Sequence, residues 1–186
     1  MYKRQFNDMA LFMWEAGCDS VQIEMASLLG NMTLTSSNKE RIARQTAKVL
    51  AEMLHKPEGR TASLQALHNL SSLDDNATIL VESSVLQAVT DIILKSQDAS
   101  PEQMELAAAI IANIVSNPGH WELAAIDKEG NCMHSSFAIL QLMQLLSLVT
   151  PQCQVSVLQI LYGIASSPKA SGNFCVTFAR YYLIFI

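Results

Sequence analysis

The pattern of hydrophobic positions repeats four times along the chain. In each copy a central residue has apolar residues three and two positions before it and directly after it. This spacing puts the three apolar side chains on one face of a helix. The central residues are Asn31, Asn69, Asn113 and Gly163, which lie 38, 44 and 50 residues apart. Repeats of this length are typical of helical solenoids, so each copy predicts one core helix of a stacked array.

Start and stop signals set the predicted bounds of the core helices near 21–33, 61–73, 101–116 and 151–166. Ser100-Pro101-Glu102-Gln103 combines an N-cap serine, a proline in the first turn and a capping-box glutamine, and Thr150-Pro151 repeats the cap and the proline. Between the core helices, apolar periodicity predicts long helices over 38–54, 85–95 and 137–149. Short helices are predicted after Asp74-Asp75-Asn76 and over 121–126.

The composition favours helices over sheets. Hydrophobic residues make up 50% of the 186 residues, aromatic residues only 6%, and Gly and Pro are few. The predicted fold class is therefore all-α. Seventeen acidic and twelve basic side chains leave a net charge of −5, and no basic run is longer than Lys3-Arg4. Both observations disfavour a nucleic-acid partner.

The chain divides into three predicted segments. Residues 1–19 are an N-terminal extension or partial repeat, 20–168 the repeat array, and 169–186 a hydrophobic tail that we interpret as truncated. The stretch from Tyr181 to Ile186 is uncharged, rich in β-forming residues and too short to cross a bilayer. No membrane span is expected.

No residue pattern points to catalysis, a metal or a cofactor. The cysteines at 18, 132, 153 and 175 lack the spacing of a redox motif or a zinc-ligand pair, and we interpret them as small core residues in a reducing compartment. Neither a nucleophile elbow nor a glycine-rich phosphate loop is present. The expected compartment is the cytoplasm, with the nucleus as the alternative.

Three stretches carry a resemblance to a known family. The sequence L-H-N-L-S-S-L-D-D-N-A-T-I-L-V-E-S-S-V-L at 67–86 resembles the third helix and following turn of an armadillo repeat. Together with 110–124 and 151–168, it resembles the armadillo arrays of plant U-box E3 ubiquitin ligases. The resemblance covers roughly residues 20–168. The U-box itself has no counterpart in this sequence.

The resemblance implies an armadillo-type right-handed α-solenoid of about three to four repeats, whose third helices line a concave groove. Asn31, Asn69 and Asn113 would form a ladder that binds the backbone of an extended partner segment there. Gln65, one turn before Asn69, is a further candidate contact. The alternative is that each asparagine only ties its helix to a neighbouring loop.

Three positions depart from the family pattern. Gly163 breaks the ladder in the fourth copy. Ser84 stands where the turn glycine is usual, which argues against a left-handed turn there. Ser27, Gln65 and Ala109 occupy the positions at which nuclear-import adaptors of this fold carry tryptophan, so a groove for nuclear signals is disfavoured.

The predicted function is a protein-protein interaction scaffold that holds a peptide or helix of a partner in the concave groove. The alternative is a substrate-recognition or regulatory part of a plant U-box E3 ubiquitin ligase, with a ubiquitination substrate as the partner. A gene fragment without independent function is the third interpretation.

Overall fold

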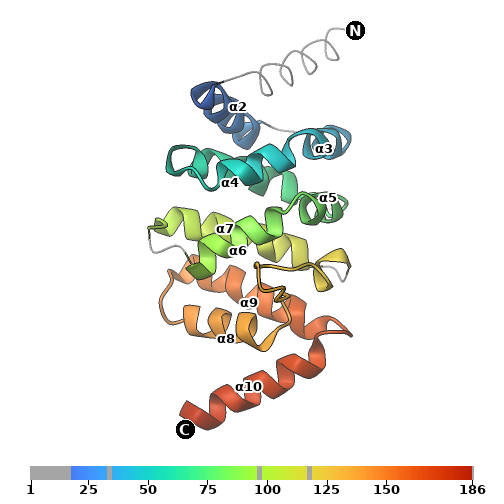
Figure 1. Cartoon of the computed structure of the whole chain (residues 1–186), viewed down its shortest axis with the longest axis vertical. Coiled ribbons are helices and arrows are strands. Elements are labelled where there is room, and N and C mark those ends of the chain that lie inside the picture. Colours follow the sequence, from blue (N-terminus) through green and yellow to red (C-terminus); the bar gives the residue numbers. More distant parts are fainter. Residues whose placement is uncertain (1–17, 33–34, 96–97, 117–118, 186) are drawn as a thin grey trace.

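The computed structural model describes residues 18–32, 35–95, 98–116 and 119–185 as helices stacked along one long axis (Figure 1). In chain order the elements are α2 (Asp19–Asn31), α3 (Ser36–Met53), α4 (Pro57–Ser71), α5 (Asn76–Glu82), α6 (Val85–Lys95), α7 (Pro101–Val115), the 3-10 turn η1 (His120–Glu122), α8 (Ser136–Leu145), α9 (Pro151–Ser166) and α10 (Ser171–Phe185). The described ranges hold no strand beyond an isolated bridge between Ala125 and Cys132. The all-α prediction is confirmed.

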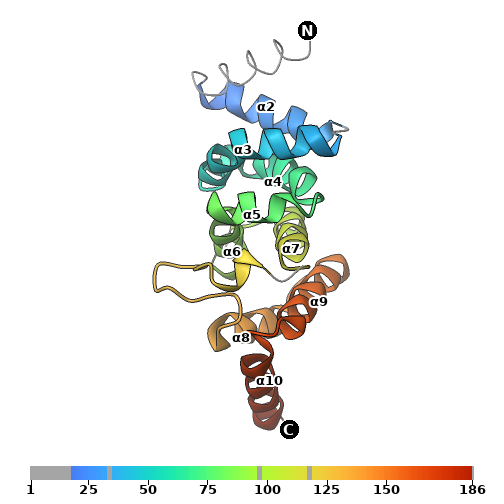
Figure 2. The same cartoon turned by 90° about the vertical axis from the view of Figure 1, so that its right-hand side faces the viewer.

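The helices form two layers. The core helices α2, α4, α7 and α9 contact one another in that order and make one layer. The other layer contains α3, α6 and α8, and each of these contacts the core helix that follows it in the chain (Figure 2). In the described part of the chain, the repeats of α4, α7 and α9 thus each contribute one helix to each layer. This arrangement, with α2 as a further core helix, confirms the predicted solenoid.

The predicted apolar stripe is buried in three of the four core helices. All nine stripe residues of α4, α7 and α9 are at most 6% exposed. In α2 the stripe differs, because Leu28 is 57% exposed and Met32 is 45% exposed. Burial between stacked helices therefore holds the inner repeats, while the first core helix keeps apolar surface open.

The predicted caps start two of the core helices. Ser100 Oγ accepts a hydrogen bond from the Gln103 amide, and Gln103 Oε1 accepts one from the Ser100 amide, so the capping box is complete. Thr150 Oγ1 accepts a hydrogen bond from the Cys153 amide at the start of α9. Both helices begin at a proline, as predicted.

Several predicted bounds are wrong. Helix α4 begins at Pro57 and not near residue 61, because Pro57 occupies the first turn of the new helix rather than merely ending the previous one. The helix predicted over 121–126 is only the single turn η1. Helix α8 ends at Leu145, earlier than expected. The stretch predicted as a hydrophobic tail contains a further helix, α10, which contacts α8 and α9.

The turn between α5 and α6 corrects another expectation. Ser84 has a φ of 61°, so it adopts the left-handed conformation that glycine usually takes at this position. Two backbone hydrogen bonds hold it: its amide donates to Val81 and its carbonyl accepts from Ala88. The geometry of the turn is therefore kept without the glycine.

Among the described residues, no single helix has the length and apolar character needed to cross a membrane. The adjacent pair α5 and α6 meets the criteria of length and composition only when taken together, across a bend of 73°.

Candidate functional site

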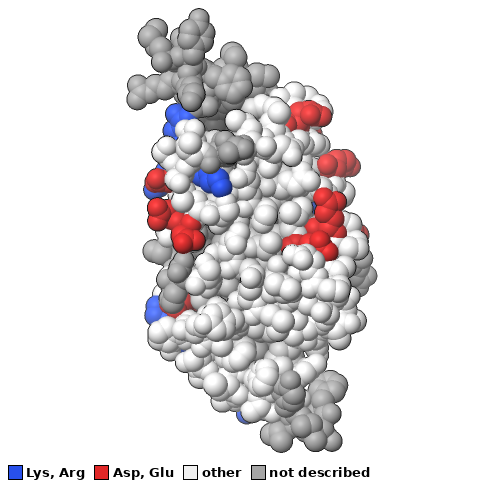
Figure 3. All heavy atoms as spheres, turned by 180° about the vertical axis from the view of Figure 1, so that it is seen from behind, with Lys and Arg blue, Asp and Glu red and all other residues white. Residues whose placement is uncertain are grey.

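The candidate site is the face formed by the core helices. Figure 3 shows the molecule from behind Figure 1, the side on which these helices lie. Acidic residues line one side of this face, the other side carries both acidic and basic residues, and a broad area without charged side chains lies between them. The predicted contact residues come from α2, α4 and α7, so the stack brings residues far apart in sequence onto one continuous layer.

Asn69 joins two neighbouring core helices. Its side-chain amide donates hydrogen bonds to the carbonyl oxygens of Leu29 at 2.7 Å and Met32 at 2.9 Å. Both carbonyls belong to the C-terminal end of α2, where helix carbonyls lack partners within their own helix. Asn69 therefore closes the end of the preceding core helix.

Asn113 and Asn31 make different contacts. Asn113 Nδ2 donates to Ser71 Oγ at 3.0 Å, and so contacts the end of α4 as Asn69 contacts the end of α2. Asn31 is exposed, and its Nδ2 donates to the carbonyl of Ser27 within its own helix at 2.8 Å. Among the described residues, Asn69 and Asn113 therefore bridge repeats, whereas Asn31 bonds within its own helix.

Gly163 replaces asparagine in the fourth copy because no side chain fits there. A Cβ atom at this position would lie 2.6 Å from the carbonyl oxygen of Val115 and 3.0 Å from its Cγ2. The backbone of α9 thus approaches the end of α7 directly, at the place where Asn69 and Asn113 reach the preceding helix through side chains. The interruption of the ladder is a packing requirement.

Gln65 lies at the closest approach of α2 and α4. A Cβ atom on Gly30 would lie 2.8 Å from Gln65 Cβ, and the Gln65 side chain is half-buried. Its Nε2 makes a long contact of 3.5 Å with Glu102 Oε1 of α7. Gln65 therefore contacts both neighbouring core helices.

These contacts give the amides a role in stacking. Within the described part of the chain, the hydrogen bonds of Asn31, Asn69 and Asn113 use the amide nitrogen as donor. The side-chain carbonyl oxygens of the three asparagines can therefore still accept hydrogen bonds from a partner. Binding of a partner by these residues and by Gln65 stays a prediction.

Sequence reasoning missed a hollow on the opposite layer. It measures about 710 Å³ and opens between α3, the α5–α6 turn and α6, with Lys128 from the loop after η1 at its rim. Its polar wall includes Lys48, Glu52, His55, Glu82, Ser84, Gln87 and Asp91. The wall residues come from three separate segments, and only the unusual turn at Ser84 could have drawn attention to this region.

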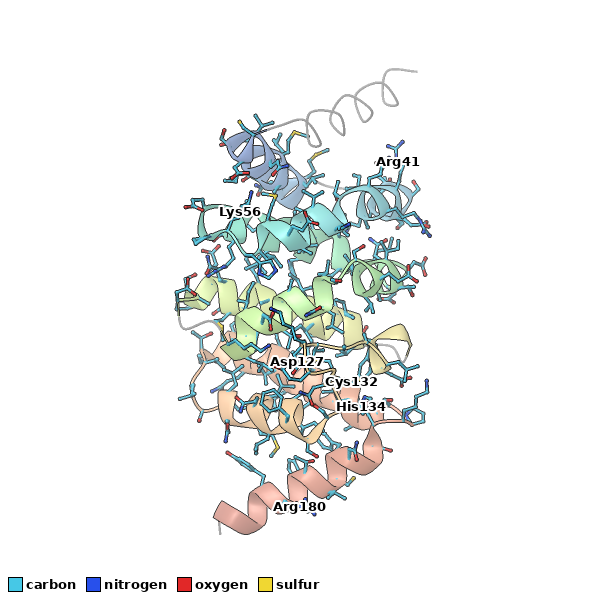
Figure 4. All side chains as sticks on the ribbon, viewed as in Figure 1. Arg41, Lys56, Asp127, Cys132, His134 and Arg180 are labelled. Carbon is cyan, nitrogen blue, oxygen red and sulfur yellow. The ribbon has the colours of Figure 1, made fainter. Side chains whose placement is uncertain are left out.

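The segment between η1 and α8 is anchored by buried carboxylates. Glu122 is 4% exposed and accepts a hydrogen bond from Ser167 and an ion pair from Lys169 at 3.2 Å. These contacts, that of Ser167 foremost, lower the pKa of Glu122. Asp127 likewise accepts two hydrogen bonds from Asn131, which lower its pKa. Figure 4 labels Asp127 on this segment, together with Cys132 and His134.

The thiols and polar clusters show no arrangement for catalysis in the described ranges. Burial raises the pKa of Cys153, which keeps that thiol protonated and unreactive. All four cysteines are free. The described residues contain no group of three or more His, Cys, Asp and Glu side chains that could hold a metal ion. The arrangement can bind, and its chemistry is that of hydrogen bonding and apolar contact.

Comparison with known proteins identifies the relatives of the sequence. No model of a protein family matches the chain. It is 27% identical to U-box domain-containing protein 44 of Arabidopsis thaliana over 157 residues, which cover 82% of the chain and 19% of that protein. It is 30% identical to U-box domain-containing protein 24 of Oryza sativa subsp. japonica over 115 residues, covering 60% of the chain and 14% of that protein. The chain spans at most about a fifth of the length of these relatives.

Comparison with solved structures identifies the fold. A designed armadillo repeat protein in complex with the peptide (KR)4 superimposes with a TM-score of 0.69 at 17% identity, covering 92% of this chain and 70% of the designed one. An engineered protein superimposes with a TM-score of 0.67 at 21% identity, covering 91% and 66%. The solenoid is therefore of the armadillo type, as the sequence resemblance implied.

Proposed function

We propose that this armadillo-repeat array, similar in sequence to plant U-box proteins, is an interaction scaffold that binds an extended segment of a partner protein along its core-helix face. The observation that carries the proposal is the continuous stack of α2, α4, α7 and α9, whose face has a broad central area without charged side chains. Regularly spaced helices of this kind suit an extended peptide, because its backbone groups also recur at a regular spacing along the stack.

Two further observations support it. The designed armadillo protein with a matching fold was solved in complex with a peptide, so this architecture accommodates one. Asn31 is exposed and Gln65 half-exposed on the same layer, and both side chains can accept and donate hydrogen bonds. An extended peptide needs such partners because its backbone N–H and C=O groups are otherwise unpaired.

The test uses a peptide selected for binding to the folded chain from a display library of random extended sequences. The groove variant is Asn31→Ala with Gln65→Ala, which leaves the Asn69 bonds between α2 and α4 intact. We expect this variant to bind the peptide at least tenfold more weakly, since it removes two contacts that are each worth about 1 kcal/mol. Isothermal titration calorimetry gives the dissociation constants.

The matched control is Glu52→Ala with Gln87→Ala in the hollow on the opposite layer. We expect peptide affinity within twofold of the wild type for this control. Weaker binding by the control and unchanged binding by the groove variant would place the peptide in that hollow and reject the proposed face. Circular dichroism spectra of both variants establish that folding is retained.

A second candidate function follows from the similarity to plant U-box proteins. In this alternative the array is a substrate-recognition or regulatory part of a U-box E3 ubiquitin ligase, and its partner is a ubiquitination substrate. The sequence similarity over 157 residues supports it, since U-box domain-containing protein 44 contains a region similar to 82% of this chain.

Fusion of the chain to a separate U-box tests this candidate. With ubiquitin-activating and conjugating enzymes, the fusion should modify a reporter that carries the selected peptide, and the groove variant of the fusion should modify it much less. Equal modification by both fusions would count against recognition by the array. Ubiquitin transfer by the chain without any fused U-box would contradict the purely scaffolding role.

A further inference from the structure

Two hollows lie at equivalent places along the edge of the stack where the core helices begin (Figure 1). One measures about 250 Å³ and lies between the starts of α2 and α4, and the other measures about 220 Å³ and lies between the starts of α7 and α9. By the repeat offsets, four pairs of their wall residues are counterparts: Asp19 and Pro101, Gln22 and Met104, Lys56 and Thr150, and Gly59 and Cys153. The hollow is thus a recurring feature of the junction between two core helices.

At the junction between α4 and α7, the chain itself supplies a side chain at this place. Arg60 is 8% exposed, and its guanidinium forms an ion pair with Asp98 at 3.3 Å. The counterparts of Arg60 and Asp98 at the next junction are Met104 and Leu148, which both line the hollow between α7 and α9. An ion pair at one junction is therefore replaced by two apolar walls at the next.

The hollow between the starts of α7 and α9, which we call the apolar hollow, has no free polar side chain in its described wall. That wall consists of six apolar residues together with Thr150 and Cys153. Thr150 Oγ1 donates to Glu105 Oε1 at 2.6 Å and accepts from the Cys153 amide, while Cys153 Sγ donates to the carbonyl of Met104 at 3.7 Å. Both polar side chains already have partners, so the wall favours an apolar occupant.

The apolar hollow also has the size for one such side chain. A cavity of about 150 Å³ lined by apolar side chains holds benzene, so a volume of about 220 Å³ accommodates a leucyl or a phenyl group. Leu148 is 80% exposed at the rim, and Met104 is half-buried in the wall. An apolar occupant would shield both from water, which favours its binding.

We propose that the apolar hollow binds one leucine or phenylalanine side chain of the partner segment. This inference rests on the proposed function, because the hollow lies at the edge of the same layer of core helices along which the segment runs. The counterpart hollow between α2 and α4 does not suit such a side chain, since the ion pair of Lys56 with Asp19 and the carboxylate of Glu58 line it. The apolar hollow therefore sets the direction in which the segment binds.

NMR of the full chain labelled with [methyl-¹³C]methionine tests the proposal, because Met104 lines the apolar hollow and Met53 lines its counterpart. The probe is N-acetyl-leucinamide. N-acetyl-asparaginamide, which has a similar shape but a polar side chain, is the control probe. We expect the leucine probe to shift the Met104 methyl signal saturably at millimolar concentration and to leave the Met53 signal in place. The asparagine probe should shift neither signal.

Leu148→Asn makes the rim of the apolar hollow polar at an exposed position, so folding should be retained. We expect it to weaken binding of the leucine probe at least fivefold. The matched control is Leu123→Asn, which is 73% exposed and outside the described wall, and it should leave binding within twofold of the wild type. An unmoved Met104 signal, equal shifts of Met53 and Met104, or equal binding of the two probes would overturn the proposal.

The display-selected peptide separates this proposal from the proposed function. It should shift the Met104 signal and displace the leucine probe. A peptide that binds the groove variant more weakly but leaves Met104 unmoved would overturn the role of the apolar hollow and leave the proposed function standing. A peptide that shifts Met104 but binds the groove variant as tightly as the wild type would support the hollow and count against the proposed core-helix face.

Discussion

Ser84 holds a backbone conformation that costs a residue with a Cβ atom about 1–2 kcal/mol. Glycine adopts this conformation without the clash. Ser84→Gly should therefore raise the free energy of unfolding by about 1 kcal/mol, measured by urea denaturation. The adjacent Ser83 has a φ of −88°, so Ser83→Gly gains no relief and should lower stability slightly. Equal effects of the two substitutions would contradict the role given to the left-handed turn.

At Gly163 a substitution is expected to destabilise the fold. Here the backbone of the neighbouring helix, and not the local φ, excludes a side chain. Gly163→Ala should lower the free energy of unfolding by about 1–3 kcal/mol, since the methyl group must displace α9 from the carbonyl of Val115. Gly172→Ala in α10 is the matched control, as a Cβ there meets open space. It should leave stability unchanged or raise it. Thermal unfolding of both variants decides the matter.

The positions of the ladder asparagines were predictable from the sequence, but their bonding partners were not. The positions of Asn69 and Asn113 could be predicted, because equivalent residues recur at the repeat spacing. Their bonding partners could not, since Leu29, Met32 and Ser71 lie about 40 residues away and are selected by how the helices stack. For the same reason the sequence indicated only that Gly163 interrupts the asparagine ladder, whereas in the structure the Gly163 backbone packs against Val115.

At the scale of elements, Glu122 connects η1 to the turn between α9 and α10 through Ser167 and Lys169. Its pKa is lowered in the folded chain, and His134 contributes to that shift in the same direction. A lowered pKa contributes stability above the unfolded value, about 4.3 for glutamate, and that contribution is lost as the pH falls through the folded pKa. Stability should therefore decline below about pH 4.3.

Glu122→Gln removes the titrating charge but keeps the size of the side chain. At neutral pH the variant should unfold more easily than the wild type, and the difference should shrink as the pH falls below the ordinary glutamate range. Urea unfolding between pH 7 and pH 3 measures this difference. A difference that stays constant over that range would mean that the Glu122 charge does not stabilise the connection.

The elements themselves were predictable to differing degrees. The core helices could be predicted from the i, i+1, i+4 apolar pattern and from their capping residues, because both signals lie within a few consecutive residues of the sequence. The start of α4 was misplaced because Pro57 both ends one helix and begins the next. The turn η1 and helix α10 could not be derived from local pattern alone, since the Glu122 contacts and the packing on α8 and α9 are tertiary.

At the scale of the whole molecule, a solenoid is stabilised mainly by contacts between neighbouring repeats. Asn69→Ala should therefore act locally: it removes two hydrogen bonds between α2 and α4, so amides in α2 should exchange with solvent faster. Amides in α9 should exchange as in the wild type. Hydrogen exchange measured by mass spectrometry tests this, with Asn31→Ala as the control. Faster exchange throughout the chain would instead indicate one cooperative unit.

The central claim is that the core-helix face of this armadillo array binds an extended protein segment. Photo-cross-linking tests it most directly, with the display-selected peptide carrying a diazirine amino acid at successive positions. We predict cross-links to α2, α4, α7 and α9 that advance along the stack as the diazirine moves along the peptide. Cross-links confined to α3 and α6, or independent of the diazirine position, would contradict the claim.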